Sequence, residues 1–102
     1  MSKLTEASRN QECTLQIYPY CNGMTETTVP AHLNSEQKGW GNKSPDWWLV
    51  DACSNCHAII DGHMKTDLDE LEVLKCQFRG LFRTLRRRIR EQQLIKVPRG
   101  CE

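Results

Sequence analysis

The sequence predicts a small α+β domain stabilised by a metal ion, and three observations support this fold class. The chain has 102 residues, enough for one modest core and near the size at which a bound metal contributes materially to stability. Two thiols, Cys53 and Cys56, stand at C-x2-C spacing, and Cys13 with Cys21 can supply a second pair. Apolar residues recur every three or four positions over about residues 67–92, which predicts a long amphipathic C-terminal helix.

The first third of the chain predicts a knuckle and then a strand. Residues 13–18 alternate polar and apolar, and turn residues surround Cys21, so residues 13–21 are predicted to form a short hairpin or zinc knuckle. Residues 27–29 are β-branched, and the proline after them keeps the chain out of the helical region. This pattern predicts a strand that leads to His32.

A ββα core is predicted over about residues 27–62. Residues 34–44 are polar and contain two glycines, which predicts a loop with Trp40 as its large apolar anchor. The apolar run at 47–50 predicts the second strand, and residues 54–62 predict a short helix.

The C-terminal helix is predicted to be capped by Asp67, with Glu70 in the capping-box position, and to end near Gln92. Residues 94–97 predict a short closing strand, and we expect one domain over residues 1–102. The apolar positions of the helix form one stripe that we expect to pack on the core, made of Leu71, Leu74, Phe78, Leu81, Leu85 and Ile89.

The cysteines favour a metal site over disulfides. Six cysteines allow three disulfides, but a C-x2-C pair in a reducing compartment is typical of metal thiolates. Cys76 and Cys101 have no partner at matching spacing and are predicted to be free thiols. Because Zn²⁺ takes four soft ligands in a tetrahedron, we predict one structural zinc site made of Cys13, Cys21, Cys53 and Cys56. The alternative is four unrelated buried thiols.

Charge is distributed unevenly although the formal net charge is only +1. Acidic residues gather between residues 67 and 72, and a run of arginines follows. On a helix, most of these arginines fall on one arc of about 60°, away from the apolar stripe, and guanidinium groups suit phosphate. We predict nucleic-acid contact through Arg79, Arg83, Arg86, Arg87 and Arg90, the alternative being a solvated face.

The first eleven residues are polar and charged, with no apolar run. We therefore expect no secretory signal, no membrane span and a cytoplasmic location.

A second set of residues can bind a catalytic ion. His57 and Asp61 are four residues apart on the predicted short helix and share a face, and His32 on the preceding strand can face the same ion. In that arrangement the ion stabilises charge at phosphorus while His32 removes a proton from water. Alternatively, His57 is a surface histidine or supports the zinc site, and His63 is predicted to be a surface residue.

The predicted loop over residues 39–46 offers a cation and a carboxylate, although it is unlike a phosphate-binding P-loop. Lys43 can reach a phosphate, and Asp46 can orient a group or bind near the metal. The alternative is an ordinary solvated turn.

The order of these residues resembles the YbcO-like prophage nuclease family. The resemblance covers roughly residues 9–61 and rests on the ordered segments Arg9-x3-Cys13-x7-Cys21-Asn22-Gly23, Glu26-Thr27-Thr28-Val29-x-Ala31-His32, Gly39-x-Gly41-x-Lys43-x-Pro45-Asp46 and Ala52-Cys53-x2-Cys56-His57-x2-Ile60-Asp61. That family is similar in turn to the RecA-dependent Ref nuclease and, more distantly, to HNH endonucleases.

The resemblance implies a ββα-metal (His-Me finger) fold in which His32 is the general base, His57 and Asp61 bind the catalytic ion, and Lys43 and Asp46 occupy the matching loop positions. HNH enzymes commonly carry an acidic ligand directly before the first histidine and a central asparagine. Ala31 stands at the first position in this chain, and Asp46 is a candidate to replace either residue.

The leading prediction is a zinc-stabilised endonuclease that hydrolyses phosphodiester bonds in DNA with Mg²⁺ or a similar ion, in phage or prophage recombination, where a recombination protein is a candidate partner. The first alternative is a non-catalytic zinc module that binds nucleic acid or a protein through its arginine helix. The second is a structural adaptor whose apolar stripe forms a dimer.

Overall fold

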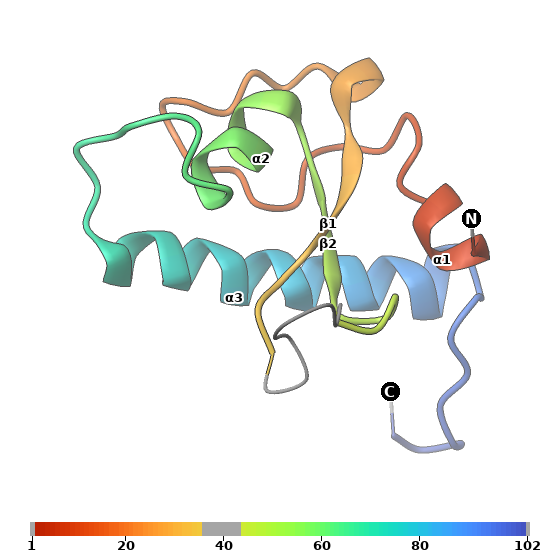
Figure 1. Ribbon diagram of the computed structural model, residues 1–102. Helices are drawn as coiled ribbons and strands as arrows, with labels where there is room; N and C mark the ends of the chain where they lie inside the picture. The colour runs from red at the N-terminus through yellow and green to blue at the C-terminus, as the bar shows by residue number, and fades with distance from the viewer. Residues whose placement is uncertain (1, 36–43, 102) are drawn as a thin grey trace.

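The computed structural model describes residues 2–35 and 44–101, and it places a two-stranded sheet against one long helix (Figure 1). The elements in chain order are α1 (Lys3–Glu6), a 3-10 turn (Thr25–Thr27), β1 (Val29–His32), β2 (Leu49–Ala52), α2 (Ser54–Ile60), α3 (Glu70–Arg86) and a π-helical turn (Arg87–Glu91). The α+β class and the long C-terminal helix predicted from the sequence are confirmed. No helix within these ranges is both long enough and apolar enough to cross a membrane.

The two strands form an antiparallel hairpin whose register fixes the position of His32. His32 pairs with Leu49, next to the connection between the strands, and Val29 pairs with Ala52 at the other end. All four residues of β2 are buried, and β1 buries Ala31 while it leaves His32 partly exposed. His32 therefore lies at the connection end of the hairpin, whereas α2 starts from the opposite end.

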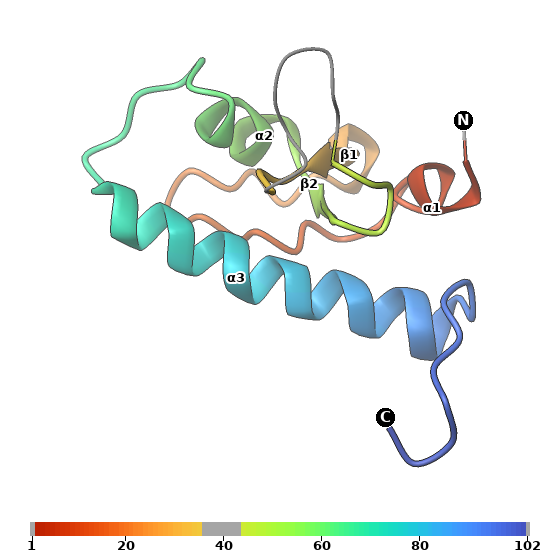
Figure 2. The same cartoon turned by 60° about the horizontal axis from the view of Figure 1, so that its bottom comes forward.

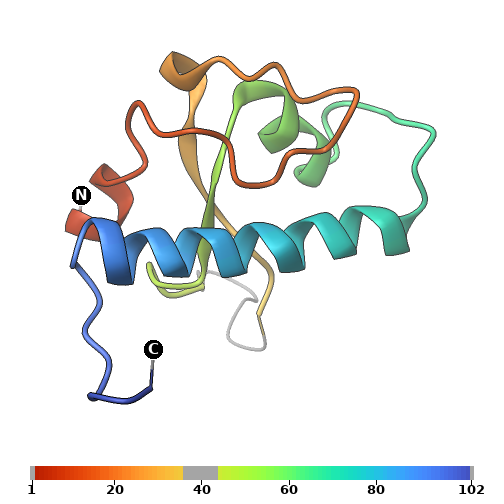
Figure 3. The same ribbon diagram turned by 180° about the vertical axis from the view of Figure 1, so that it is seen from behind.

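Residues 13–21 pass between α2 and α3 (Figure 3). The segment turns at Ile17, whose carbonyl oxygen accepts from the amides of Tyr20 and Cys21. No strand pairing occurs within these residues, so the segment is a knuckle, the second of the two predicted forms, and not a hairpin. It lies close to α3 at Gly80, where an added Cβ would lie 3.2 Å from the carbonyl oxygen of Thr14. A larger residue at this position would therefore require the knuckle or the helix to shift.

The N-terminal end of α3 differs from the prediction, whereas its π-helical turn ends at Glu91, next to the predicted Gln92. Asp69 is the N-cap, and its carboxylate accepts from the amide of Glu72 at 2.8 Å. Asp67, the predicted cap, instead accepts from the hydroxyl of Tyr20 at 2.6 Å. Residues 94–97 do not form the predicted strand and belong to a tail that leaves the end of the helix (Figure 2).

The packed face of α3 and its π-helical turn overlaps only in part with the predicted apolar stripe. Gly80, Leu81, Thr84 and Arg88 are buried, whereas three of the six stripe residues, Leu71, Leu74 and Phe78, are exposed. At 100° per residue the buried face lies roughly 110° away from the exposed apolar residues. The small residues at 80 and 84 admit the knuckle, and Arg88 pairs with a buried carboxylate, so close approach and charge pairing decide which face is covered.

The core lies between β2, the knuckle, α2 and the inner face of α3. Its buried apolar side chains, together with three buried cysteines, are Leu15, Ile17, Ala31, Leu33, Val50, Ala52, Ile59 and Leu81.

Candidate functional site

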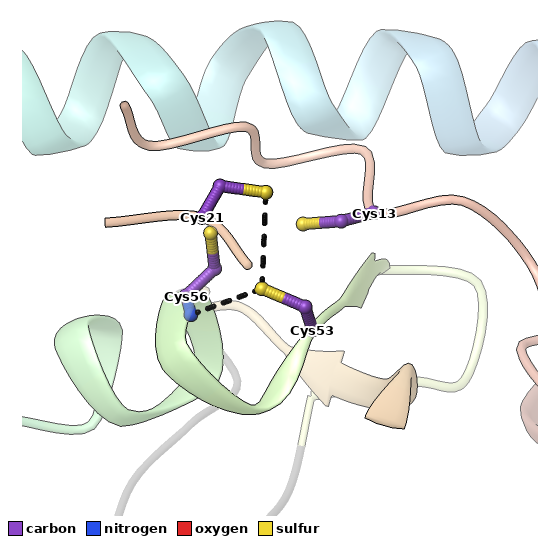
Figure 4. Close-up of side chains that lie close together, drawn as sticks. All are labelled: Cys13, Cys21, Cys53 and Cys56. Carbon is purple, nitrogen blue, oxygen red and sulfur yellow. Dashed lines mark hydrogen bonds between the residues drawn. The ribbon is translucent and has the colours of Figure 1, made fainter. Parts of the chain in front are cut away.

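The four predicted zinc ligands lie together between the knuckle and the start of α2 (Figure 4). The Sγ atoms of Cys13, Cys21, Cys53 and Cys56 all lie within 4.8 Å of one another, and three of the residues are buried. Four sulfurs at about 2.3 Å from a central Zn²⁺ lie about 3.8 Å apart in a tetrahedron. The Sγ atoms of Cys53 and Cys21 are separated by 3.8 Å.

Local backbone geometry fixes the sulfurs. Cys53 is the N-cap of α2, and its Sγ accepts from the amide of Cys56 at 3.4 Å. The Sγ of Cys56 accepts from the amide of Ile17, also at 3.4 Å, so the knuckle and the helix each donate to the cluster. Amide donors aimed at sulfur stabilise a thiolate, the form that binds metal.

The thiols share protons unequally. A hydrogen bond from the Cys56 side chain lowers the pKa of Cys13 to about 5, and the same contact raises the pKa of Cys56. Burial raises the pKa of Cys21 to about 11. These contacts favour the thiolate form of Cys13 and the protonated form of Cys21 and Cys56. A bound cation would take the place of those protons.

The donor set fits a structural zinc ion. Four thiolates in a tetrahedral cluster leave no open position, which is typical of structural rather than catalytic zinc. Cys13 and Cys21 belong to the knuckle, and Cys53 and Cys56 belong to the start of α2. A metal ion held by these four cysteines would fix the knuckle to the ββα unit.

The candidate catalytic residues form two exposed pairs. His32 Nε2 lies 2.9 Å from Asp46 Oδ1, and the two side chains are 26% and 43% exposed. His57 Nε2 lies 3.0 Å from Asp61 Oδ2 on the surface of α2. The sequence named all four residues, and the structure brings them together two by two.

Over residues 2–35 and 44–101, the four cysteines are the one group of three or more His, Cys, Asp or Glu side chains placed to hold a metal ion. A site at His57 and Asp61 would therefore need further ligands from water or a bound phosphate. Lys43 and Trp40, the other predicted loop residues, lie outside the described residues.

A buried charge cluster centred on Asp51 was not predicted. Asp51 is fully buried, and its carboxylate accepts from Ser8 at 2.6 Å, from Arg87 at 2.6 Å and from two nitrogens of Arg88 at 2.6 and 3.1 Å. Arg88 also donates to the carbonyl oxygen of Leu4. The signal in the sequence was the acidic residue inside an otherwise apolar strand, because a buried carboxylate requires a cationic partner.

The arginines predicted to contact nucleic acid differ in exposure and in their contacts within the protein. Arg87 is only 14% exposed and pairs with Asp51, and Arg83 donates to the carbonyl oxygen of Thr14 at 2.8 Å. Arg79, Arg86 and Arg90 are exposed. The guanidinium of Arg86 lies over the ring of Phe82, 5.4 Å from its centroid.

Comparison with known proteins shows the family. The family described as "Putative nuclease YbcO" matches residues 2–93. Proteins named "Putative nuclease YbcO" from Escherichia coli K12 and from Enterobacteria phage 82 are each 38% identical over 85 residues, which is 82% of this chain and 88% of theirs. The solved structure of a "putative bacteriophage protein" from E. coli K-12 MG1655 superposes with a TM-score of 0.71 at 34% identity, covering 84% of this chain and 95% of that one. The chain therefore belongs to the YbcO family, whose members are named as nucleases.

Proposed function

We propose that the protein is a metal-dependent endonuclease that hydrolyses phosphodiester bonds in DNA with an HNH-type (His-Me finger) site on β1, β2 and α2. The observation that carries the proposal is the hydrogen bond between His32 and Asp46, two side chains fourteen residues apart at the connection end of the hairpin. Both remain accessible to solvent and substrate. The nuclease names of the relatives support the same reaction class.

His32 acts as the general base. The carboxylate of Asp46 accepts from Nε2, which holds the proton on that nitrogen and leaves the Nδ1 lone pair to take a proton from water. Asp46 therefore acts as a positioning residue that selects the tautomer and orients the ring. Ala31, the residue before the histidine, is 2% exposed, so a carboxylate at that position would be buried in the core. Asp46 supplies the carboxylate from the other side of the hairpin connection.

His57 and Asp61 hold the catalytic ion, Mg²⁺ or another divalent cation. An imidazole nitrogen and a carboxylate oxygen, both partly exposed, leave room for water and phosphate oxygens as the remaining ligands. When bound, such an ion stabilises the negative charge that develops on the phosphate. The two side chains come from one face of α2, so a rigid element sets their separation.

Arg79, an exposed arginine of α3, contacts the DNA backbone, because an exposed guanidinium group suits a phosphate. We place this activity in the cytoplasm, where cysteine thiols remain reduced and available to zinc.

Nicking of supercoiled plasmid tests the proposal. We expect nicking with Mg²⁺ or Mn²⁺ that EDTA stops, and His32→Ala should lower the rate by about 10²-fold or more, the contribution of a general base. Asp46→Asn should lower the rate by about 10-fold to 100-fold, since it acts through His32.

The matched control is His63→Ala, which removes an exposed histidine outside both pairs. All variants should keep their zinc content and their circular dichroism spectrum. Nicking by His32→Ala at the wild-type rate would exclude His32 as the base. DNA binding without cleavage under any divalent metal would favour the non-catalytic zinc module instead.

A further inference from the structure

The outer side of α3 carries a continuous apolar face that is largely exposed in the described parts of the chain, with Val97 and Cys101 of the tail beside its end at Phe82. Leu71 and Leu74 are each 58% exposed, Phe78 is 76% exposed and Phe82 is 62% exposed. At 100° per residue these four side chains fall within about 80°, so they form one face over three turns. We name these four residues the outer face.

Two grooves lie along the outer face, and both are lined in part by Phe78. One of about 430 Å³ lies between α3 and the hairpin and is lined by Leu33, Trp48 and Leu74. Another of about 410 Å³ lies beside Phe78, Phe82 and Leu85. A ridge of apolar side chains with grooves alongside it matches the surface of another helix of the same kind.

We propose that the outer face binds the same face of a second copy of this chain, with the two α3 helices antiparallel. In a symmetric dimer the same surface patch of each copy forms the interface, so an apolar face of one copy can pack against the apolar face of the other. Charge along the helix selects the antiparallel direction. The first turn of α3 is acidic, with Glu70 and Glu72, and its last turn is basic, with Arg83 and Arg86.

The antiparallel alignment follows from the ends of the apolar run. The apolar surface continues from the outer face to the half-buried Leu85 and Ile89. Centring two copies on the midpoint between Leu71 and Ile89 places Phe78 of one helix opposite Phe82 of the other. The same alignment places Glu72 between Arg86 and Arg90 of the second copy. Glu72, Arg86 and Arg90 lie within about 40° of one another around the helix, on the same flank of the outer face. In an antiparallel pair related by a two-fold axis, this flank of one helix lies beside the same flank of the other. Each end of the interface therefore joins opposite charges.

The area of the outer face is sufficient for such a dimer. Two phenylalanine side chains of about 200 Å² each, exposed to this extent, offer about 280 Å². With the two leucines the apolar area reaches about 500 Å² per copy, or about 1,000 Å² for the pair, which is the lower limit for a specific interface. A patch of this size is also at the upper range for a monomer surface.

Sedimentation equilibrium of the full chain tests the dimer. The wild-type protein should sediment at twice the mass of one chain, and Phe78→Glu should sediment as a monomer because it places a charge at the centre of the interface. Tyr18→Glu is the matched control, since Tyr18 is an aromatic residue 68% exposed on the knuckle. It should leave the mass unchanged. A monomeric wild-type chain at its highest soluble concentration, or a dimeric Phe78→Glu variant, would overturn the proposal.

A charge exchange tests the direction. Glu72→Arg and Arg90→Glu should each raise the dimer dissociation constant by about threefold, the size expected for an exposed ion pair. The double variant should recover the wild-type value, because the two charges change places. In a parallel dimer each residue faces its own copy, so no recovery would occur, and that result would exclude the antiparallel arrangement. The zinc content and circular dichroism of the Phe78 variant establish that the folded chain was measured.

Discussion

The interior of this protein and the surface of its ββα unit both contain paired aspartates, which are buried in the interior and partly exposed on the surface. Asp51 is fully buried and accepts hydrogen bonds from one serine and two arginines. Asp46 and Asp61 are 43% and 45% exposed, and each pairs with a histidine. A buried carboxylate enclosed by several donors is held in one position, whereas a partly exposed carboxylate beside a histidine can still contact water and bind ligands.

The cysteines follow the same division. Cys13, Cys21, Cys53 and Cys56 form one compact cluster, whereas Cys101 on the tail is exposed and outside it. The difference teaches that burial, rather than residue type, separates the structural sites of this chain from its candidate catalytic ones. Substitutions in the interior should therefore change stability, and those on the exposed pairs should change activity alone.

The largest effect is expected at the cysteine cluster. Cys56→Ser removes one of four thiolates, and structural zinc in zinc-finger peptides supplies about 10–16 kcal/mol of binding free energy that is coupled to folding. We expect loss of bound zinc and of the cooperative unfolding transition, measured by elemental analysis and circular dichroism. Cys101→Ser, the matched control, should keep both. A Cys56→Ser protein that unfolds at the wild-type temperature would contradict a structural role for the metal.

A smaller but clear loss is expected at the buried carboxylate. Asp51→Asn leaves Arg88, which is 1% exposed, without its charge partner, and breaking a buried ion pair in this way costs about 3–5 kcal/mol. Urea unfolding should measure this loss. The same exchange at the exposed Asp61 should change the free energy of unfolding by about 0.5 kcal/mol or less and should stop plasmid nicking. Equal destabilisation by the two substitutions would remove the distinction between the two regions.

Spacing in the sequence predicted the thiol cluster and α2, because a C-x2-C pair and a short helix depend on neighbours close in the chain. The two strands lie about two residues later than predicted, and Thr27 belongs to a 3-10 turn. Spacing did not predict which face of α3 is covered. That choice depends on Gly80 lying against the knuckle and on Arg88 reaching Asp51, contacts between residues far apart in sequence. The pairing of His32 with Asp46 depends on how the hairpin connection closes. The sequence predicted both residues as candidate site residues but did not predict the contact between them.

The smallest effect is expected for the arginines of α3 and its π-helical turn, where an exposed side chain and a paired side chain occur on the same helix. Arg79 is exposed, whereas Arg87 is paired with Asp51. Arg79→Ala should lower the slope of log affinity for DNA against log salt by about 0.9 for one lost phosphate contact. Stability should stay constant. Arg87→Ala should destabilise the fold, and Lys65→Ala, an exposed cation away from α3, should change neither property. Filter binding over a range of salt concentrations measures the slope, and an unchanged slope for Arg79→Ala would remove this helix from the DNA interface.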